Sequence, residues 1–299
     1  MTFNLYDAAN ISFAIQQATY LESQLLRVRY PGITWDRDIP VDTSANPYAA
    51  SVTFLAIDQV GTAKLVNGTS DDLPLASISL NKYENAVRMG GIGYALSLEE
   101  LGQAQMVGVP IQTEAVFAAN LAYNKFMLGA AFYGTGMPSG TTGLYNNGSA
   151  TAGSATGLWS GLTADQIITD FNALLSGVWS ASSGVELADT VRLPLAVYQI
   201  LLKPRSTVSD TTVLKFLQDA NIYTQMTGKP LDIKGDYQLS TRAVAYTKDP
   251  TAVKLVLPMP LQFLPPQPRD LSFYFPGMFR LAGLDIRRPG ALRYLDGVA

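Results

Sequence analysis

The side chains on which most enzyme chemistry depends are scarce in this sequence. Its 299 residues include no histidine and no cysteine. Disulfide bonds, thiolate or imidazole catalysis, and metal sites built from these two ligands are therefore excluded. Carboxylates remain, and their oxygens could hold Mg²⁺ or Ca²⁺ or act as general acids and bases.

The adjacent carboxylates Glu99 and Glu100 are a candidate pair of the kind that glycosidases use. Neighbouring residues on a helix point about 100° apart, so these two carboxylates do not face each other. Ser97 precedes them in the pattern of a helix N-cap, and acids in the first turn complement the helix dipole. The pattern therefore favours a capped helix, and a carboxylate-based hydrolase is kept only as an alternative.

A glycine-rich stretch, residues 133–140 (YGTGMPSG), invites comparison with a phosphate-binding loop. Such a loop follows a strand, opens a helix and carries a Gly-Lys-Ser/Thr sequence. Here the stretch follows a helical pattern and contains no lysine. We expect a helix end followed by a flexible linker.

The helical pattern before that stretch covers residues 111–132. At about 100° per residue, Asn120 and Asn124 fall on a narrow polar stripe, while Ala119 and Ala122 belong to the opposite, apolar side. We expect this apolar side to be closely packed, and the helix to be covered nearly all round as a structural beam. The polar residues near its centre argue against a membrane span.

Composition points to a protein that is covered by copies of itself. Hydrophobic residues make up 47% and charged residues 15% of the chain, below the roughly 25% charged residues of ordinary soluble domains. The net charge is −3, and no basic run suggests a sequence-specific nucleic-acid element. Residues 1–20 lack the basic and apolar regions of a secretory signal.

Hydrophobic periodicity and turn residues predict the remaining elements. Helices are expected at 8–28, from 97, at 163–179 and at 211–223. Strands are expected at 51–58, 76–89, 231–239, 242–246 and 253–257, and long strands over 271–298. A further strand is expected within 191–202, with Pro194 near its start. The strands 51–58 and 76–89 enclose turn residues and predict a long hairpin that needs a partner surface. The low-complexity stretch 146–157 marks a candidate domain boundary.

Two stretches of sequence, together with the order of these parts, carry a resemblance to a known protein family. The stretches are AANLAYNKFMLGAAFYG followed by TTGLYNN, and RLAGLDIRRPGALRYLDGV near the C-terminus. The chain resembles, over residues 1–299, the major capsid proteins of tailed bacteriophages with the Hong Kong 97-like fold. The most similar members are a phage and prophage family formerly catalogued as a domain of unknown function.

The resemblance implies an α+β capsid fold with defined parts. These are an N-terminal arm at 1–48, an extended hairpin loop at 49–92, a peripheral domain at 93–154 and 254–299 with a spine helix at 111–132, and an axial α/β domain at 155–253. It implies a structural protein with no enzyme activity and no cofactor. Pentamers and hexamers would form an icosahedral shell around the double-stranded DNA genome.

The resemblance also directs attention to the hairpin and the C-terminal strands as contacts between subunits. Some family members form Lys–Asn crosslinks, and Lys64, Lys82 and Asn67 lie in or near the hairpin, but no motif assigns a reacting pair. The candidate inter-subunit contacts are Lys64, Asn67, Asp71, Asp72, Tyr83, Arg88, Arg287 and Arg288.

The implied partners are the chain itself, portal and scaffold proteins, and double-stranded DNA bound without sequence specificity; decoration proteins are left open and no membrane partner is expected. The shell would belong to the virion and be assembled in the bacterial host cytoplasm. Because the chain starts almost directly at the arm, we expect a separate scaffold or a mature form. An encapsulin-like nanocompartment and another self-assembling phage structural protein are the alternatives, although the α/β section argues against a tail or adhesin protein.

Overall fold

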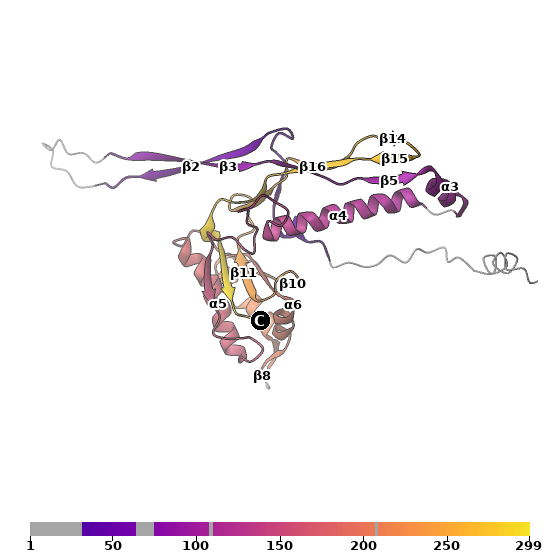
Figure 1. Cartoon of the computed structure of the whole chain (residues 1–299). Coiled ribbons are helices and arrows are strands. Elements are labelled where there is room, and N and C mark those ends of the chain that lie inside the picture. Colours follow the sequence, from indigo (N-terminus) through magenta and orange to yellow (C-terminus); the bar gives the residue numbers. More distant parts are fainter. Residues whose placement is uncertain (1–31, 64–74, 108–109, 207–208) are drawn as a thin grey trace, which may run out of the picture. The chain divides into compact units, whose positions relative to one another are not determined.

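The computed structural model describes residues 32–63, 75–107, 110–206 and 209–299. Helices and strands are mixed along these ranges, as the α+β expectation requires (Figure 1). The helix expected at 8–28 and the tip of the expected hairpin lie outside the described residues. Residues 33–299 form a unit of their own, which contains two large hydrophobic cores.

The long helix expected at 111–132 is present as α4 (Ile111–Tyr133). Pro110 occupies its N-cap position, and its C-cap residue Gly134 has φ 71°, a left-handed conformation that glycine adopts without strain. The backbone N–H of Gly134 donates to the carbonyl of Ala130 and closes the last turn. The first glycine of the YGTGMPSG stretch therefore ends the helix.

The packed side of α4 agrees only in part with the one expected from the sequence, since Ala119 is buried as expected and Ala122 is not. Ala119, Tyr123, Met127 and Ala131 are buried, whereas Ala122 is exposed. The polar stripe is engaged instead, because Trp35 Nε1 donates a hydrogen bond to Asn124 Oδ1 over 3.3 Å.

Nor is α4 covered all round within the subunit. Phe117 is half exposed, and Ala118 is exposed as well. A helix with this much apolar surface still needs cover on its outer side.

The chain turns back sharply after α4. Leu144 N–H donates to the Ala131 carbonyl over 3.0 Å, and Tyr145 N–H donates to the Phe132 carbonyl over 2.9 Å. The rings of Phe132 and Tyr145 stack with centroids 4.5 Å apart. The stretch expected as a flexible linker thus begins as an ordered return onto the helix end.

A five-stranded sheet lies between the two cores, in the order β10–β7–β11–β18–β6. Its strands are β6 (Thr151–Ser154), β7 (Thr190–Pro194), β10 (Asp232–Asp236), β11 (Arg242–Tyr246) and β18 (Leu292–Asp296). Along β11, Val244 and Tyr246 belong to the core that contains α4, while Ala243 and Ala245 belong to the other core. Successive strand residues point to opposite faces, so one strand serves both cores.

Helices of the second core follow the expected pattern only in part. They are α5 (Ala164–Ala181), α6 (Leu195–Leu201), α7 (Val213–Asp219) and α8 (Ile222–Thr227), with a small hairpin of β8 (Pro204–Ser206) and β9 (Ser209–Thr212). Pro194 ends β7 and precedes α6, so the strand expected within 191–202 is shorter and earlier. The helix expected at 211–223 is two helices, because Asn221 accepts from Thr224 N–H and donates to the Leu217 carbonyl.

Two expected helix caps are present. Thr163 and Gln166 form a capping box at the start of α5. At the start of α3 (Leu98–Val107), Ser97 N–H donates to Glu100 Oε2 over 2.9 Å, and Glu100 N–H donates to Ser97 Oγ over 3.1 Å. These hydrogen bonds lower the pKa of Glu100, which acts as a cap residue here.

Three small sheets combine segments that are far apart in sequence: β1–β12–β17, β13–β16–β4 and β14–β15–β5. The strands are β1 (Val41–Asp42), β4 (Arg88–Gly91), β5 (Tyr94–Ser97), β12 (Val253–Val256), β13 (Met259–Phe263), β14 (Gln267–Arg269), β15 (Ser272–Phe275), β16 (Gly277–Leu281) and β17 (Gly283–Ile286). The long strands expected over 271–298 are therefore four short ones in four sheets. Pro276 separates β15 from β16, and the 3₁₀ turn Pro289–Ala291 separates β17 from β18.

The expected hairpin is formed by β2 (Ser51–Val60) and β3 (Ser77–Ala86). The strands pair antiparallel from Ser51 opposite Ala86 to Val60 opposite Ser77. They make a sheet of two strands only. A two-stranded hairpin is marginal in water by itself, so both of its faces benefit from cover.

We predict that Ala131→Glu prevents folding, whereas the same substitution at Ala122 leaves the subunit folded. Ala131 is fully buried, and a carboxylate placed there without a partner costs several kcal/mol out of a total stability of about 5–15 kcal/mol. Soluble yield and the circular dichroism melt compare the two variants. Equal tolerance of both would show that the buried side of α4 is wrongly identified.

We also predict that Gly143→Ala destabilises the helix exit while Gly148→Ala does not. A Cβ at Gly143 would lie 2.2 Å from the backbone carbon of Phe132, which cannot move without shifting α4, and a Cβ at Gly148 would meet nothing within 4 Å. A melting temperature at least several degrees lower is expected for the first variant only. Unchanged melting of Gly143→Ala would contradict the close return of the chain.

Candidate assembly surfaces

One face of the β2–β3 hairpin is apolar and uncovered in the subunit. Leu55 and Ile57 alternate along β2, and the register places Leu80 opposite Ile57 and Ile78 opposite Gln59. Directly opposed residues share a face, so these side chains form one continuous ladder. The four apolar side chains are 62–69% exposed. Contiguous apolar patches of this kind mark surfaces that bind another protein.

Two of the candidate contact residues meet at the base of the hairpin, on its other face. The rings of Tyr83 and Phe54 stack with centroids 5.0 Å apart, and the guanidinium carbon of Arg287 lies 4.8 Å from the centroid of the Phe54 ring. Arg287 Nε also pairs with the buried carboxylate of Asp285 over 3.1 Å. Within the subunit, Arg287 therefore holds the hairpin base against the end of β17.

The other two described candidates have separate surroundings. Arg88 is exposed on β4, where it pairs opposite Leu281 of β16. Arg288 makes an ion pair with Glu186, a buried residue that follows α5. Arg88 is thus directed at solvent, and Arg288 contributes to the subunit itself.

The remaining four candidates, Lys64, Asn67, Asp71 and Asp72, lie outside the described residues. Lys82 is described and pairs with Glu84 on the same strand over 3.1 Å, with both side chains largely exposed. A hydrogen bond with Ser51, followed by the Lys82 contacts, lowers the pKa of Glu84. Exposed pairs of this kind add little stability, so they leave the apolar ladder as the main feature of the hairpin.

A second uncovered surface lies where β4 and β16 meet α4. It is a groove of about 340 Å³ lined mainly by apolar side chains. Ala122 and Phe126 of α4 contribute to it, Met89 lies on its β4 side, and Arg88 stands among its lining residues. The exposed Ala122, expected as a packing residue inside the subunit, is part of this groove.

The described residues show no arrangement suited to a bound metal. Among them, no group of three or more Asp or Glu side chains could hold an ion. Nor does any described helix reach the length and apolarity needed to cross a membrane.

The apolar ladder is the feature that sequence reasoning missed. The candidates from the sequence are mainly charged and amide residues, whereas the exposed hydrophobic area of the hairpin lies on its strands. The signal was present, because Leu55 and Ile57, like Ile78 and Leu80, repeat at the strand period of two. Such alternation is usually taken as the side that faces the protein's own core.

Solved structures with the same fold are capsids and related particles. The capsid of Myoviridae phage XM1 matches with a TM-score of 0.82 and 23% identity, covering 95% of this chain and 98% of that chain. The capsid of a native GTA particle matches with a TM-score of 0.66 and 14% identity, covering 98% and 100%. A virus-like particle from Pyrococcus furiosus matches with a TM-score of 0.54 and 13% identity, covering 87% and 91%. The expected Hong Kong 97-like fold is confirmed by this likeness to phage capsids.

Sequence comparison agrees with the fold. No curated protein sequence matches the chain. A family model described as major capsid protein matches residues 61–298, which includes β3, α4, most of both cores and all the C-terminal strands but not β2. The capsid fold and the uncovered apolar face of the hairpin agree with this family match. The chain therefore belongs to the major capsid protein family.

Proposed function

We propose that pentamers and hexamers of this chain form the icosahedral shell that encloses the double-stranded DNA of a tailed bacteriophage. The observation that carries the proposal is the apolar face of the β2–β3 hairpin. A ladder of exposed leucine and isoleucine on a two-stranded sheet has no use in a monomer. A neighbouring copy of the chain is the partner that a capsid always supplies.

We propose a receiving surface on that neighbour as well. The groove beside α4 is apolar, carries the exposed Ala122, and has Arg88 among its lining residues. The hairpin ladder is bordered on the same face by Lys82, opposite Leu55, and by Glu84, opposite Thr53, and these two side chains pair with each other. Apolar contact at the centre with a polar rim is a usual arrangement for an interface.

The proposed parts of the subunit are the peripheral domain at 93–154 and 254–299 and the axial domain at 155–253, with the hairpin at 49–92 and the arm at 1–48. Two separate hydrophobic cores support this division. The strands β6 and β18, assigned to the peripheral part, pair in the same sheet as β7, β10 and β11. The two domains would therefore share a sheet across their boundary.

The remaining partners follow from the shell. We propose portal and scaffold proteins as partners in assembly, which would take place in the cytoplasm of the bacterial host. The net charge of −3 suits a container that holds DNA without neutralising many phosphates. The candidate contacts Lys64, Asn67, Asp71 and Asp72 stay proposals for the hairpin tip. Arg88 is the strongest of the described candidates because it is exposed and lines the groove beside α4.

A protein cage that encloses enzymes is the alternative, and the virus-like particle of Pyrococcus furiosus has a similar fold. The family match favours the capsid. Particles from cells that carry the complete phage or prophage decide between them, because a capsid contains nuclease-protected double-stranded DNA and a cage contains protein cargo.

We predict that the purified chain, expressed alone, assembles into shells, rings or larger irregular particles. Its low charge content and its uncovered apolar surfaces favour association at micromolar concentration. Analytical ultracentrifugation and electron microscopy measure the outcome. A uniform 32.2 kDa monomer at near-physiological salt would count heavily against a capsid function.

We predict that Leu80→Asp blocks assembly without unfolding the subunit. Leu80 is 62% exposed in the subunit, so the charge meets water there but would be buried at the proposed interface. Asn81→Asp adds the same charge on the opposite face of the same strand and serves as the control. Normal shells from Leu80→Asp would show that the apolar ladder is not an interface.

A further inference from the structure

A short segment, residues 33–42, connects α4 to two sheets, and we call it the strap. It contains α2 (Trp35–Asp38) and β1. At one end, Trp35 donates to Asn124, and its ring lies edge-on to the ring of Tyr123 with centroids 6.5 Å apart. At the other end, β1 pairs in parallel with β12. Between these anchors, the strap crosses the five-stranded sheet at Asp38.

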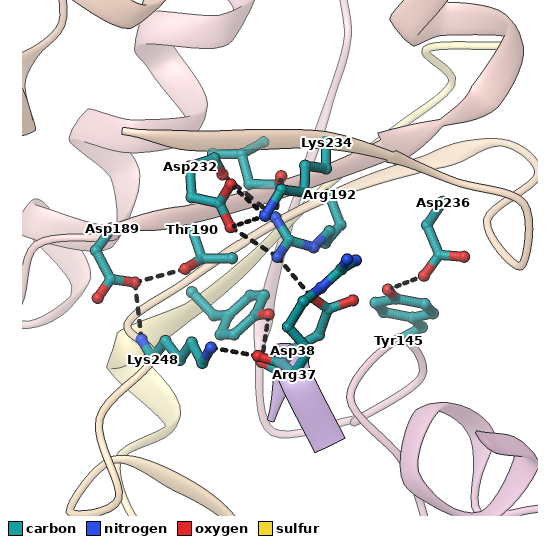
Figure 2. Close-up of polar contacts among 12 residues, drawn as sticks. Arg37, Asp38, Tyr145, Asp189, Thr190, Arg192, Asp232, Lys234, Asp236 and Lys248 are labelled. Atoms are coloured by element: carbon teal, nitrogen blue, oxygen red, sulfur yellow. Dashed lines mark hydrogen bonds and ion pairs between the residues drawn. The ribbon is translucent and has the colours of Figure 1, made fainter. Parts of the chain in front are cut away.

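Buried charges join the strap to that sheet (Figure 2). Arg192 Nη2, on β7, donates to Asp38 Oδ1 over 2.7 Å, and both side chains are only 2% exposed. The Tyr246 hydroxyl donates to the Asp38 carbonyl oxygen over 2.7 Å, and Lys248 Nζ donates to the carbonyl of Arg37. The strap is therefore held by polar contacts from β7, from β11 and from the residues just after β11.

Arg192 has a second carboxylate, which is unusual for a buried ion pair. Its Nη2 also lies 2.8 Å from Asp232 Oδ2, and Lys234 Nζ lies 2.9 Å from the other oxygen of that carboxylate. Asp232 is 39% exposed on its side chain. Burial would raise its pKa, but hydrogen bonds from Lys234 and Arg192 outweigh burial and lower it, so Asp232 is charged at neutral pH.

Removing one partner of a buried pair normally leaves an uncompensated buried charge, which opposes separation. Here, withdrawal of Asp38 leaves Arg192 paired with Asp232 and hydrogen-bonded to the carbonyl of Val191. The withdrawn Asp38 carboxylate would be hydrated. Release of the strap therefore leaves no unpaired buried charge on either side, and its cost lies in exposing the buried side chains of Trp35 and Ile39.

The closed contact is also incompletely satisfied. Among the described residues that are not exposed, the buried side-chain polar atoms with no hydrogen-bond partner are Thr34 Oγ1 and Arg192 Nε. Thr34 lies in the strap, and Arg192 is the residue that pairs with Asp38. Buried polar groups without a protein partner oppose the state that buries them.

We propose that the strap is a releasable latch. When closed, it ties α4 to the five-stranded sheet through Trp35 and Asp38, in addition to the core that the two elements share. When open, it leaves that core as their connection, so that small shifts between them cost less. We infer that this freedom allows one chain to occupy both pentamer and hexamer positions. This inference rests on the proposed function. Interfaces with two discrete arrangements are the usual means of such adjustment.

Limited trypsin digestion of the unassembled subunit, prepared in the Leu80→Asp background, tests the latch. Arg37 lies within the strap, and we expect the bond after it to be protected while the strap is closed. Asp38→Asn removes the charge and keeps the shape, so cleavage after Arg37 should be about tenfold faster. Lys248→Met, at an exposed position, removes one contact to the strap backbone and should give a smaller increase. Asp165→Asn breaks an exposed pair with Arg205 and should change nothing.

Mass spectrometry identifies the cut sites and circular dichroism checks the fold. Unchanged cleavage after Arg37 in both strap variants, or faster cleavage spread over the whole chain, would overturn the latch. Asp38 directly follows the cut bond, and an acidic residue there slows trypsin by itself. Lys248→Met leaves residues 37 and 38 unchanged, so it decides the question, also if Asp38→Asn fails to fold. This test does not need shells, so it stands apart from the proposed function.

Electron microscopy then tests the role in assembly. Shells of Asp38→Asn should show a wider range of diameters than wild-type shells. Faster cleavage after Arg37 together with shells of one unchanged diameter would confirm the latch and refute its role in fitting two positions. Absence of any wild-type assembly would instead refute the proposed function.

Discussion

Both hydrophobic cores depend on β11. Val244 and Tyr246 pack toward α4, and Ala243 and Ala245 pack toward the helices of the second core. Alternation along a strand makes this possible only while β11 keeps its register with β7 and β18. A slip of one residue would exchange the large and small side chains and spoil both cores together. The position of α4, and with it the base of the hairpin, therefore follows from the register of this central strand.

Sequence patterns correctly predicted the elements that are determined by residues close together in the sequence. The boundaries of α4 and the caps of α3 and α5 depend on residues within a few positions, such as Ser97 with Glu100 and Thr163 with Gln166. The orientation of α4 depends on Trp35, which hydrogen-bonds to Asn124 from 89 positions away. Without knowledge of that partner, the stripe bearing Asn124 is correctly judged polar, but its contact with Trp35 cannot be foreseen.

The sequence also failed to identify the main candidate surface, and the reason is different. Polar residues attract attention as binding residues, whereas permanent interfaces are built mainly from apolar ones. The sequence carries the alternation of Leu55 and Ile57, but alternation does not tell whether the covering partner is the same chain or another copy. Exposure of the ladder in the folded subunit makes that distinction, and the candidates Tyr83 and Arg287 prove to be engaged with Phe54 inside the subunit.

The last strands of the chain enter four different sheets, pairing β15 with β5, β16 with β4, β17 with β12 and β18 with β11. None of these sheets is complete until the strands after residue 271 have been made and have folded back onto earlier segments. Such long-range pairing is slow, because loop closure must precede the contacts it brings. The apolar groove beside α4, which needs β16, would then form late in folding. Partly folded chains would thus be unable to associate prematurely through that groove, although many copies are made close together.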